Sequence, residues 1–116
     1  MYGSSRIQQI NQGSAQTLIR AGTCVLSAVR GYSSNASPAT THSYIQIWDA
    51  ATAASITVGA TSPNWVVACV SSNVSDGDGL PTMGVMIRDG IVIACTSQVG
   101  AGNAVSANLN VEICIV

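Results

Sequence analysis

The clearest alternation of apolar and polar residues lies between Ser43 and Gly59. Ile45 and Ile47 alternate there with polar or aromatic neighbours, which is the period of two expected of a strand with one face on a core. After a run of small residues, a second alternating segment covers Ser55–Val58 and stops at a glycine. The pattern predicts two strands joined by a small-residue connection.

Other apolar runs of similar length predict further strands. One covers residues 17–29, where Gly22 is expected to bend the strand or break it in two. The run 65–70 is nearly all apolar, which is typical of a strand covered on both faces. The C-terminal run 109–116 alternates around Glu112 and is expected to turn three side chains inward. These are Val111, Ile113 and Ile115.

Asp89 and Gly90 lie between two apolar runs, Met83–Arg88 and Ile91–Thr96. An Asp-Gly pair in this position is a strong signal for a two-residue type I′ turn, because both residues tolerate a positive φ. The sequence therefore predicts a β-hairpin over residues 83–96.

The turn spacing and the lack of a long amphipathic helical pattern predict an all-β protein, a single antiparallel β-sandwich of roughly eight short strands over residues 17–116. Residues 1–16 are rich in Gln, Ser and Gly and contain too few apolar residues to order themselves. We expect an extended N-terminal arm that is held against the domain's own edge or against a neighbouring subunit. Its candidate partner-binding residues are Tyr2, Arg6, Ile7 and Ile10.

Only 8% of the residues are charged and 47% are hydrophobic, whereas ordinary soluble proteins have roughly 25% charged residues. This deficit indicates that much of the surface does not face bulk water. The net charge is −1 and the four arginines are scattered, so the clustered cations of a nucleic-acid interface are missing. No apolar run approaches the ~20 residues of a membrane helix, and no signal-peptide pattern is present. Neither nucleic acid nor a membrane is expected as a partner.

The cysteines are widely spaced, and each lies in a strand-like run. They are Cys24, Cys69, Cys95 and Cys114. A zinc site and a disulfide framework are the alternatives, but structural zinc favours close pairs on turns, so buried thiols are the favoured interpretation. Asp76-Gly77-Asp78-Gly79 suggests calcium, yet the rest of a twelve-residue calcium loop is missing. No metal and no cofactor are expected.

Catalytic groups are sparse, because the chain has one histidine, His42, and five carboxylates. A carboxylate pair could form from Asp76 with Asp78 or from Asp49 with Asp89, but solvated turn residues are the favoured interpretation. The sequence therefore predicts a protein that is not an enzyme.

Four segments together resemble a family of small virion proteins from tailed bacteriophages. They are Tyr44–Ala50, Ile56–Gly59, Ser62-Pro63 and Gly90–Ser97. Members of the family carry a similar Tyr-hydrophobic-Gln-hydrophobic-aromatic-Asp-Ala strand and a Gly-hydrophobic strand that ends in small residues. The resemblance covers roughly residues 24–116. It implies a jelly-roll-like β-sandwich that decorates or cements a capsid, or that serves in a tail or fibre assembly.

The resemblance leads us to expect a capsid decoration or cement protein that binds and stabilises neighbouring shell subunits. The expected partner is the major capsid protein. The protein itself is expected to be a homo-oligomer, and a trimer is the oligomeric state considered. Its expected location is the virion, after assembly in the host cytoplasm. The alternative is a tail, baseplate or fibre component with a receptor- or glycan-binding role. In that role four aromatic side chains could stack on sugar rings, Tyr32, Tyr44, Trp48 and Trp65.

Overall fold

The computed structural model describes residues 6–12, 15–33, 43–69, 84–96, 99 and 109–116. These residues contain eight β-strands and one short 3-10 helix, η1 (Ala53–Ser55). The strands are β1 (Arg6–Gln12), β2 (Thr17–Ala21), β3 (Cys24–Ser33), β4 (Ser43–Asp49), β5 (Trp65–Cys69), β6 (Val85–Ile87), β7 (Gly90–Thr96) and β8 (Leu109–Ile115). None of the described segments contains a helix that is long and apolar enough to span a membrane.

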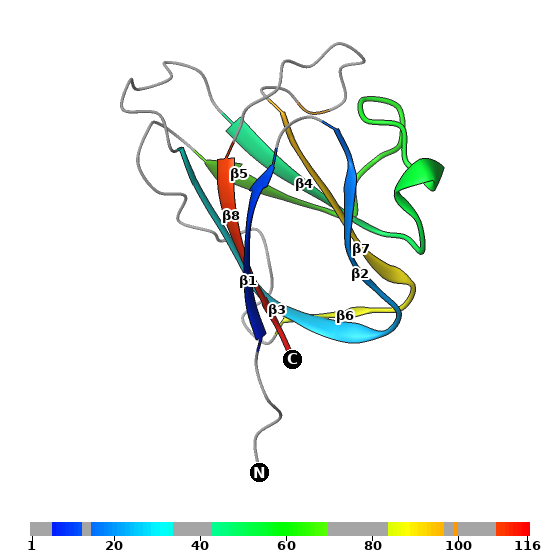
Figure 1. The fold of residues 1–116 in the computed structure, drawn as a ribbon. Helices are drawn as coiled ribbons and strands as arrows, with labels where there is room; N and C mark the ends of the chain where they lie inside the picture. Colours follow the sequence, from blue (N-terminus) through cyan, green and yellow to red (C-terminus); the bar gives the residue numbers. More distant parts are fainter. Residues whose placement is uncertain (1–5, 13–14, 34–42, 70–83, 97–98, 100–108) are drawn as a thin grey trace.

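The strands form two four-stranded sheets that pack face to face (Figure 1). Sheet A has the order β1-β8-β3-β6, and sheet B has the order β2-β7-β4-β5. All strand pairs in both sheets are antiparallel. The all-β, antiparallel β-sandwich predicted from the sequence is therefore confirmed.

The pairing of the strands follows a simple rule along the chain. The first half of the described strands pairs with the second half in reverse order, β1 with β8, β2 with β7, β3 with β6 and β4 with β5. Two further pairs, β3 with β8 and β4 with β7, complete the sheets. Among these strands, β4 and β5 alone are consecutive in the chain and lie in the same sheet.

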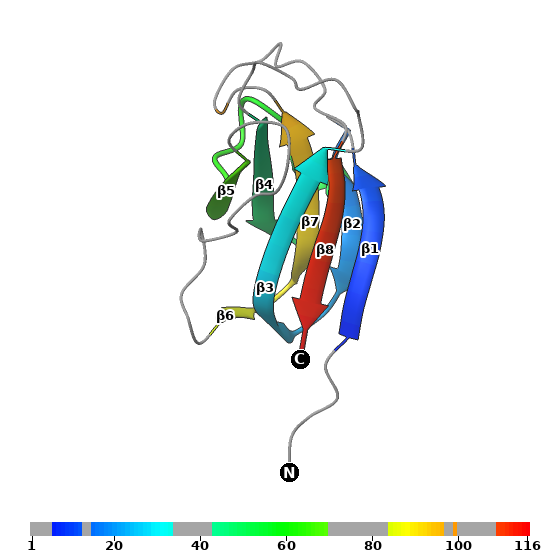
Figure 2. The same cartoon turned by 90° about the vertical axis from the view of Figure 1, so that its left-hand side faces the viewer.

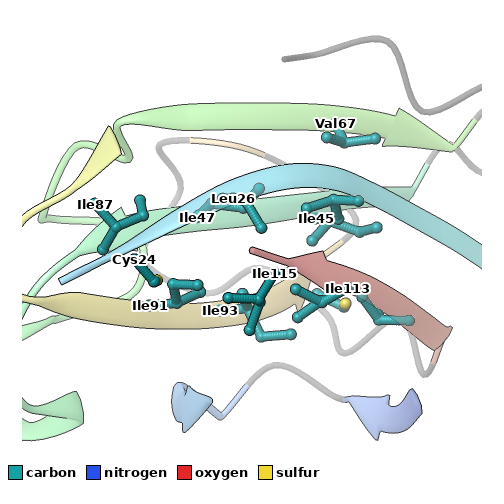
Figure 3. Packing of buried hydrophobic residues seen from close by; sticks show 13 residues of the cluster. Cys24, Leu26, Ile45, Ile47, Val67, Ile87, Ile91, Ile93, Ile113 and Ile115 are labelled. Carbon is teal, nitrogen blue, oxygen red and sulfur yellow. The ribbon is translucent and has the colours of Figure 1, made fainter. Parts of the chain in front are cut away.

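The core lies between the two sheets, where side chains from facing strands interdigitate (Figure 3). Leu26 and Ile113 enter it from sheet A, Ile45 and Ile93 enter it from sheet B, and all four are fully buried. Each buried side chain of this size contributes roughly 1.5–3 kcal/mol relative to leaving it in water. Burial of the core side chains therefore contributes a large favourable free energy, which holds the two sheets together.

The C-terminal strand has the alternation expected of it. Val111, Ile113 and Ile115 are buried in the core, while Glu112 between them is only half-buried. A strand with one covered face is the case in which a period of two identifies the buried side chains reliably.

The residues after Asp49 differ from the prediction. A second strand was expected over residues 55–58, but Ala53–Ser55 forms η1 and no strand follows it before β5. The alternation arose because Ile56 is buried and Val58 half-buried. Ile56 and Val58 thus pack against a sheet, although their own segment is not a strand.

The segment that contains η1 covers the outer face of sheet B. Trp48 points to this face and is only 1% exposed, because it packs with Ile56 and with Val92 and Ala94 of the neighbouring strand. Its indole N–H donates a hydrogen bond to the carbonyl oxygen of Thr61 at 3.0 Å. An apolar outer face is thus covered by the chain itself, and the polar atom of the tryptophan has a partner.

The predicted hairpin over residues 83–96 is wrong. β6 belongs to sheet A and β7 to sheet B, so the two residues between them, Arg88 and Asp89, connect the sheets. Gly90 does not have a positive φ. A Cβ atom there would lie 2.5 Å from the carbonyl oxygen of Ala50 and 2.9 Å from that of Arg20. The glycine is required by the close approach of two backbones and not by a type I′ turn.

Two other strand expectations have opposite outcomes. Gly22 has a φ of +89° and separates β2 from β3, which confirms the predicted break. β5 was expected to be covered on both faces, but it is an edge strand of sheet B, with Val67 buried and Ala68 exposed. The run of apolar residues therefore overstated its burial.

Part of the expected N-terminal arm is a strand of the sandwich. β1 pairs with β8 without interruption, from Arg6 opposite Ile115 to Gln12 opposite Leu109. Of the two placements considered, these seven residues take the edge of their own domain. The remainder of the arm up to residue 14 lies outside the described residues.

We predict that Gly90→Ala destabilises the protein by about 3 kcal/mol, the upper part of the range for overpacked sites. The new methyl group would meet the backbone oxygens of Arg20 on β2 and of Ala50 just after β4, and the backbone of both segments is held by pairing or hydrogen bonding at Gly90 and β7. Urea denaturation followed by circular dichroism measures the change. Gly22→Ala is the control, because it has open space and bears only the left-handed backbone cost of about 1 kcal/mol. An equal or smaller loss in Gly90→Ala would contradict the packing argument.

Candidate interaction surface

Asp49 lies at the end of β4, beside the connection between β6 and β7. Its carboxylate accepts hydrogen bonds from the backbone N–H groups of Arg88 at 2.9 Å, Asp89 at 2.8 Å and Gly90 at 3.3 Å. Burial alone would raise the pKa of this carboxyl group, but the three N–H groups and the nearby Arg88 guanidinium outweigh it and hold the pKa below its ordinary value. The ionised side chain therefore fixes the connection between the sheets.

The structure brings Asp49 and Asp89 together, which is one of the two carboxylate pairs considered from the sequence. They meet through the backbone N–H of Asp89, whose residue is exposed. The position of Asp49 is explained by its role in the fold. The other pair, Asp76 and Asp78, and the single histidine, His42, lie outside the described residues.

The cysteines whose side chains are described form no disulfide, and they lie in different environments. Cys24 and Cys95 are buried in the core, and Cys114 is half-buried. Burial raises the pKa of the Cys24 thiol, Arg20 opposes this change, and the charge of Asp49 adds to it. The side chain of Cys69 lies outside the described set, and among the described residues no three His, Cys, Asp or Glu side chains group to hold a metal ion.

The outer face of sheet A carries the most exposed apolar side chains of the two sheets, whereas the segment around η1 covers Trp48 and Val92 on the outer face of sheet B. Met86 on β6 is 63% exposed, and Val116 at the end of β8 is 49% exposed. Between them lies Val25, which is opposite Met86 and exchanges two backbone hydrogen bonds with Val116, at 2.9 and 3.2 Å. Directly paired residues of antiparallel strands share one face. Met86, Val25 and Val116 thus form a row across three strands, here called the apolar row.

Figure 2 looks onto this outer face, with β3, β8 and β1 side by side and β6 at the lower edge. Next to the apolar row, a shallow pocket of about 220 Å³ lies between β3 and β8. It is lined by Ala28, Arg30, Glu112, Ile113 and Cys114. Arg30 is opposite Glu112 in the register, so a cation and an anion stand beside an apolar floor. The face therefore offers both apolar area and a pair of opposite charges.

An irregularity in β3 shapes this pocket. The register with β8 shifts between Leu26 and Ala28, and the Ser27 hydroxyl donates to the carbonyl oxygen of Cys114 at 3.0 Å. The extra residue allows both Leu26 and Val29 to face the core while Ala28 stays exposed. Bulges of this kind commonly redirect side chains at functional positions.

The structure describes three of the four candidate partner-binding residues that were chosen from the sequence. Tyr2 lies outside the described residues. Arg6, Ile7 and Ile10 belong to β1, an edge strand of sheet A, and only their backbone is described. The structure thus places three of the four on the sheet that carries the apolar row, and their role in binding stays a prediction.

Sequence reasoning did not identify the apolar row. A signal was available, because Ile87 and Met86 have opposite parity in a strand, so an inward Ile87 implies an outward methionine. The same parity turns Val116 outward, because it follows the inward Ile115, whereas nothing in the sequence distinguishes Val25 from a core valine.

Three of the four aromatic residues considered for sugar stacking are poorly accessible. Trp48 is 1% exposed and is bonded to Thr61. Trp65 and Tyr44 are half-buried, and Trp65 packs against the main core. The side chain of Tyr32 lies outside the described set.

Comparison of the chain with models of known protein families, with curated protein sequences and with solved structures returns no match. The resemblance to virion proteins of tailed bacteriophages therefore stays a prediction.

We predict that Asp49→Asn lowers the free energy of unfolding at pH 7 by about 1–2 kcal/mol, because the amide nitrogen cannot accept the Arg88 N–H. The folded-state pKa of Asp49 is lowered, so its stabilisation is complete above the unfolded-state value of about 4 and is lost as the pH falls through the folded-state pKa. The difference in the free energy of unfolding between wild type and variant should therefore become smaller on acidification below pH ~4.

Urea denaturation at neutral and acidic pH measures this difference. Asp89→Asn is the matched control, since it removes an exposed carboxylate from the same connection and should change stability by about 0.5 kcal/mol or less. If Asp49→Asn is neutral at pH 7, the carboxylate does not stabilise the connection.

Proposed function

We propose that this protein is a non-enzymatic structural protein of the virion of a tailed bacteriophage, which decorates or cements the capsid. It binds the major capsid protein and stabilises neighbouring shell subunits. The observation that carries the proposal is the strand order, β1-β8-β3-β6 facing β2-β7-β4-β5.

The strand order supports a jelly-roll assignment by its geometry. In a long hairpin of four plus four strands, the first strand pairs with the last and the fourth pairs with the fifth, as they do here. When such a hairpin rolls up, its strand pairs are distributed alternately between two sheets. Jelly rolls of eight strands are an architecture of viral capsid and lectin domains. This step is an analogy at the level of the fold, since one fold can serve several functions.

The composition supports an assembly protein independently of the fold. A charged fraction of 8% leaves few groups to keep a monomer well hydrated, and proteins packed among symmetric copies have less need of such groups. The sequence resemblance over roughly residues 24–116 agrees with this interpretation.

In this proposal the outer face of sheet A lies on the shell. Its apolar row would leave water on contact, whereas the outer face of sheet B already has its cover from the segment around η1. Arg30 and Glu112 would add polar contacts that fix the orientation of the protein on the shell.

The alternative of a glycan-binding fibre component has less support. Sugar rings stack on accessible aromatic faces, and Trp48 is buried with its N–H already bonded.

We predict that the purified protein binds undecorated shells and raises their melting temperature. The double variant Met86→Ser with Val116→Ser should bind at least about tenfold more weakly, because it removes the two most exposed apolar side chains of the row. Sedimentation of shells with bound protein measures the affinity, and scanning calorimetry measures the melting temperature.

Leu18→Ser is the matched control, since Leu18 is 37% exposed but lies on β2 in sheet B. It should bind as the wild type does. Failure of the wild type to bind shells would overturn the proposed function. Equal losses in both variants would overturn only the choice of face.

A further inference from the structure

β1 is an edge strand with a long and regular backbone. Among the described strands it pairs with β8 alone, so its second edge presents alternate N–H and C=O groups that no described strand bonds. Such an edge is a template on which another strand can add.

Natural proteins usually protect sheet edges with short strands, bulges, lysines or prolines. In this sandwich β6 has only three residues, and β2 has a register shift between Leu18 and Arg20. β1 has seven residues in unbroken register, and its sequence RIQQINQ contains no Lys, Pro or Gly. It is the longest of the four edge strands described, and its one charged residue, Arg6, stands at its first position, which leaves residues 7–12 without such protection.

The sequence of β1 is compatible with pairing to itself. A two-fold axis perpendicular to a sheet places one residue opposite its own copy, and pairing of the whole strand puts that residue at Gln9, the fourth of seven. Arg6 then lies opposite Gln12 of the second copy, and Ile7 lies opposite Asn11 of the second copy. The only charged residue of the strand thus meets an amide, whereas a parallel pairing in register would place Arg6 against itself, which is unfavourable.

We propose that β1 is a dimerisation edge, at which it pairs antiparallel with β1 of a second copy of this chain, centred on Gln9. The product is a continuous sheet in which the order β6-β3-β8-β1 is followed by β1-β8-β3-β6 of the second copy. An isologous contact of this kind closes as a dimer and not as the trimer considered from the sequence.

The dimer has a consequence for shell binding that rests on the proposed function. A two-fold axis perpendicular to the sheet keeps both outer faces on the same side, so two apolar rows would face the shell together. Dimerisation itself needs no shell, and it is tested on the isolated protein.

The first test is disulfide crosslinking of Gln9→Cys. Directly opposite residues of antiparallel strands have Cα atoms about 4.5–5.5 Å apart, which lies within the range that a disulfide spans. Gln12→Cys is the matched control, because it lies three residues from the centre and about 20 Å from its copy. Mild oxidation should give a covalent dimer with Gln9→Cys and none with Gln12→Cys or the wild type, whose described thiols are buried or half-buried.

The second test is sedimentation velocity of the wild type and of Gln9→Lys. The wild type should sediment as a dimer. In Gln9→Lys, two lysines would meet at the axis, so dimer affinity should fall at least about tenfold. Gln9 is opposite Glu112 within its own sheet, so the lysine should leave the unfolding temperature of the monomer unchanged.

The proposal would be overturned if the wild type were a monomer, or if it were a higher oligomer in which Gln9→Cys does not crosslink. Equal crosslinking at positions 9 and 12 would also overturn it. None of these outcomes would overturn the proposed function, which the Met86 and Val116 variants test separately.

Discussion

Burial of β7 on both faces is the constraint on which the rest of this fold depends. All seven residues of the strand are buried. Ile91, Ile93 and Cys95 enter the core between the sheets, while Val92 and Ala94 contact the cover around Trp48. A strand of this kind needs two layers of protein above and below it, so the sandwich and the covering segment must form together. The Asp49 carboxylate then fixes the chain where it enters β7, at the point where Gly90 fits between two neighbouring backbones.

The two outer faces of the sandwich differ in how far the chain itself covers them. Sheet B has a cover of about a dozen residues around η1 that excludes water from Trp48 and Val92. Sheet A, as far as its side chains are described, presents Met86, Val116 and a charged pocket to solvent. Contiguous exposed apolar area on a soluble domain commonly marks a contact with another molecule. The two outer faces therefore differ, since one is covered in part by the segment around η1 and the other exposes Met86 and Val116.

The sequence predicts individual strands and inward side chains better than it predicts which sheet a strand joins. The alternation at Val111, Ile113 and Ile115 is local, and it holds because β8 has one covered face. Asp89-Gly90 carries a local turn signal, but membership of β6 and β7 in different sheets is decided by contacts with distant strands. Ile56 has the spacing of a strand residue, yet it packs on the outside of a sheet. The candidate surface was partly within reach, since parity already turns Met86 and Val116 away from the core. That the two lie in one row depends on the pairing of each with Val25.

The reverse-order pairing of the strands also determines when each part of the fold can form. β4 and β5 are close in the sequence and can meet early, but β1 bonds to β8, so about a hundred residues separate the two partners. Closing so large a loop costs entropy before any contact is gained. Of the eight described strands, β1 comes first in the chain, and β8, with which it pairs, comes last. Sheet A can therefore be completed only once the last of the described strands is in place, and β1, in which Ile7 and Ile10 are the apolar residues, is the strand that depends on it.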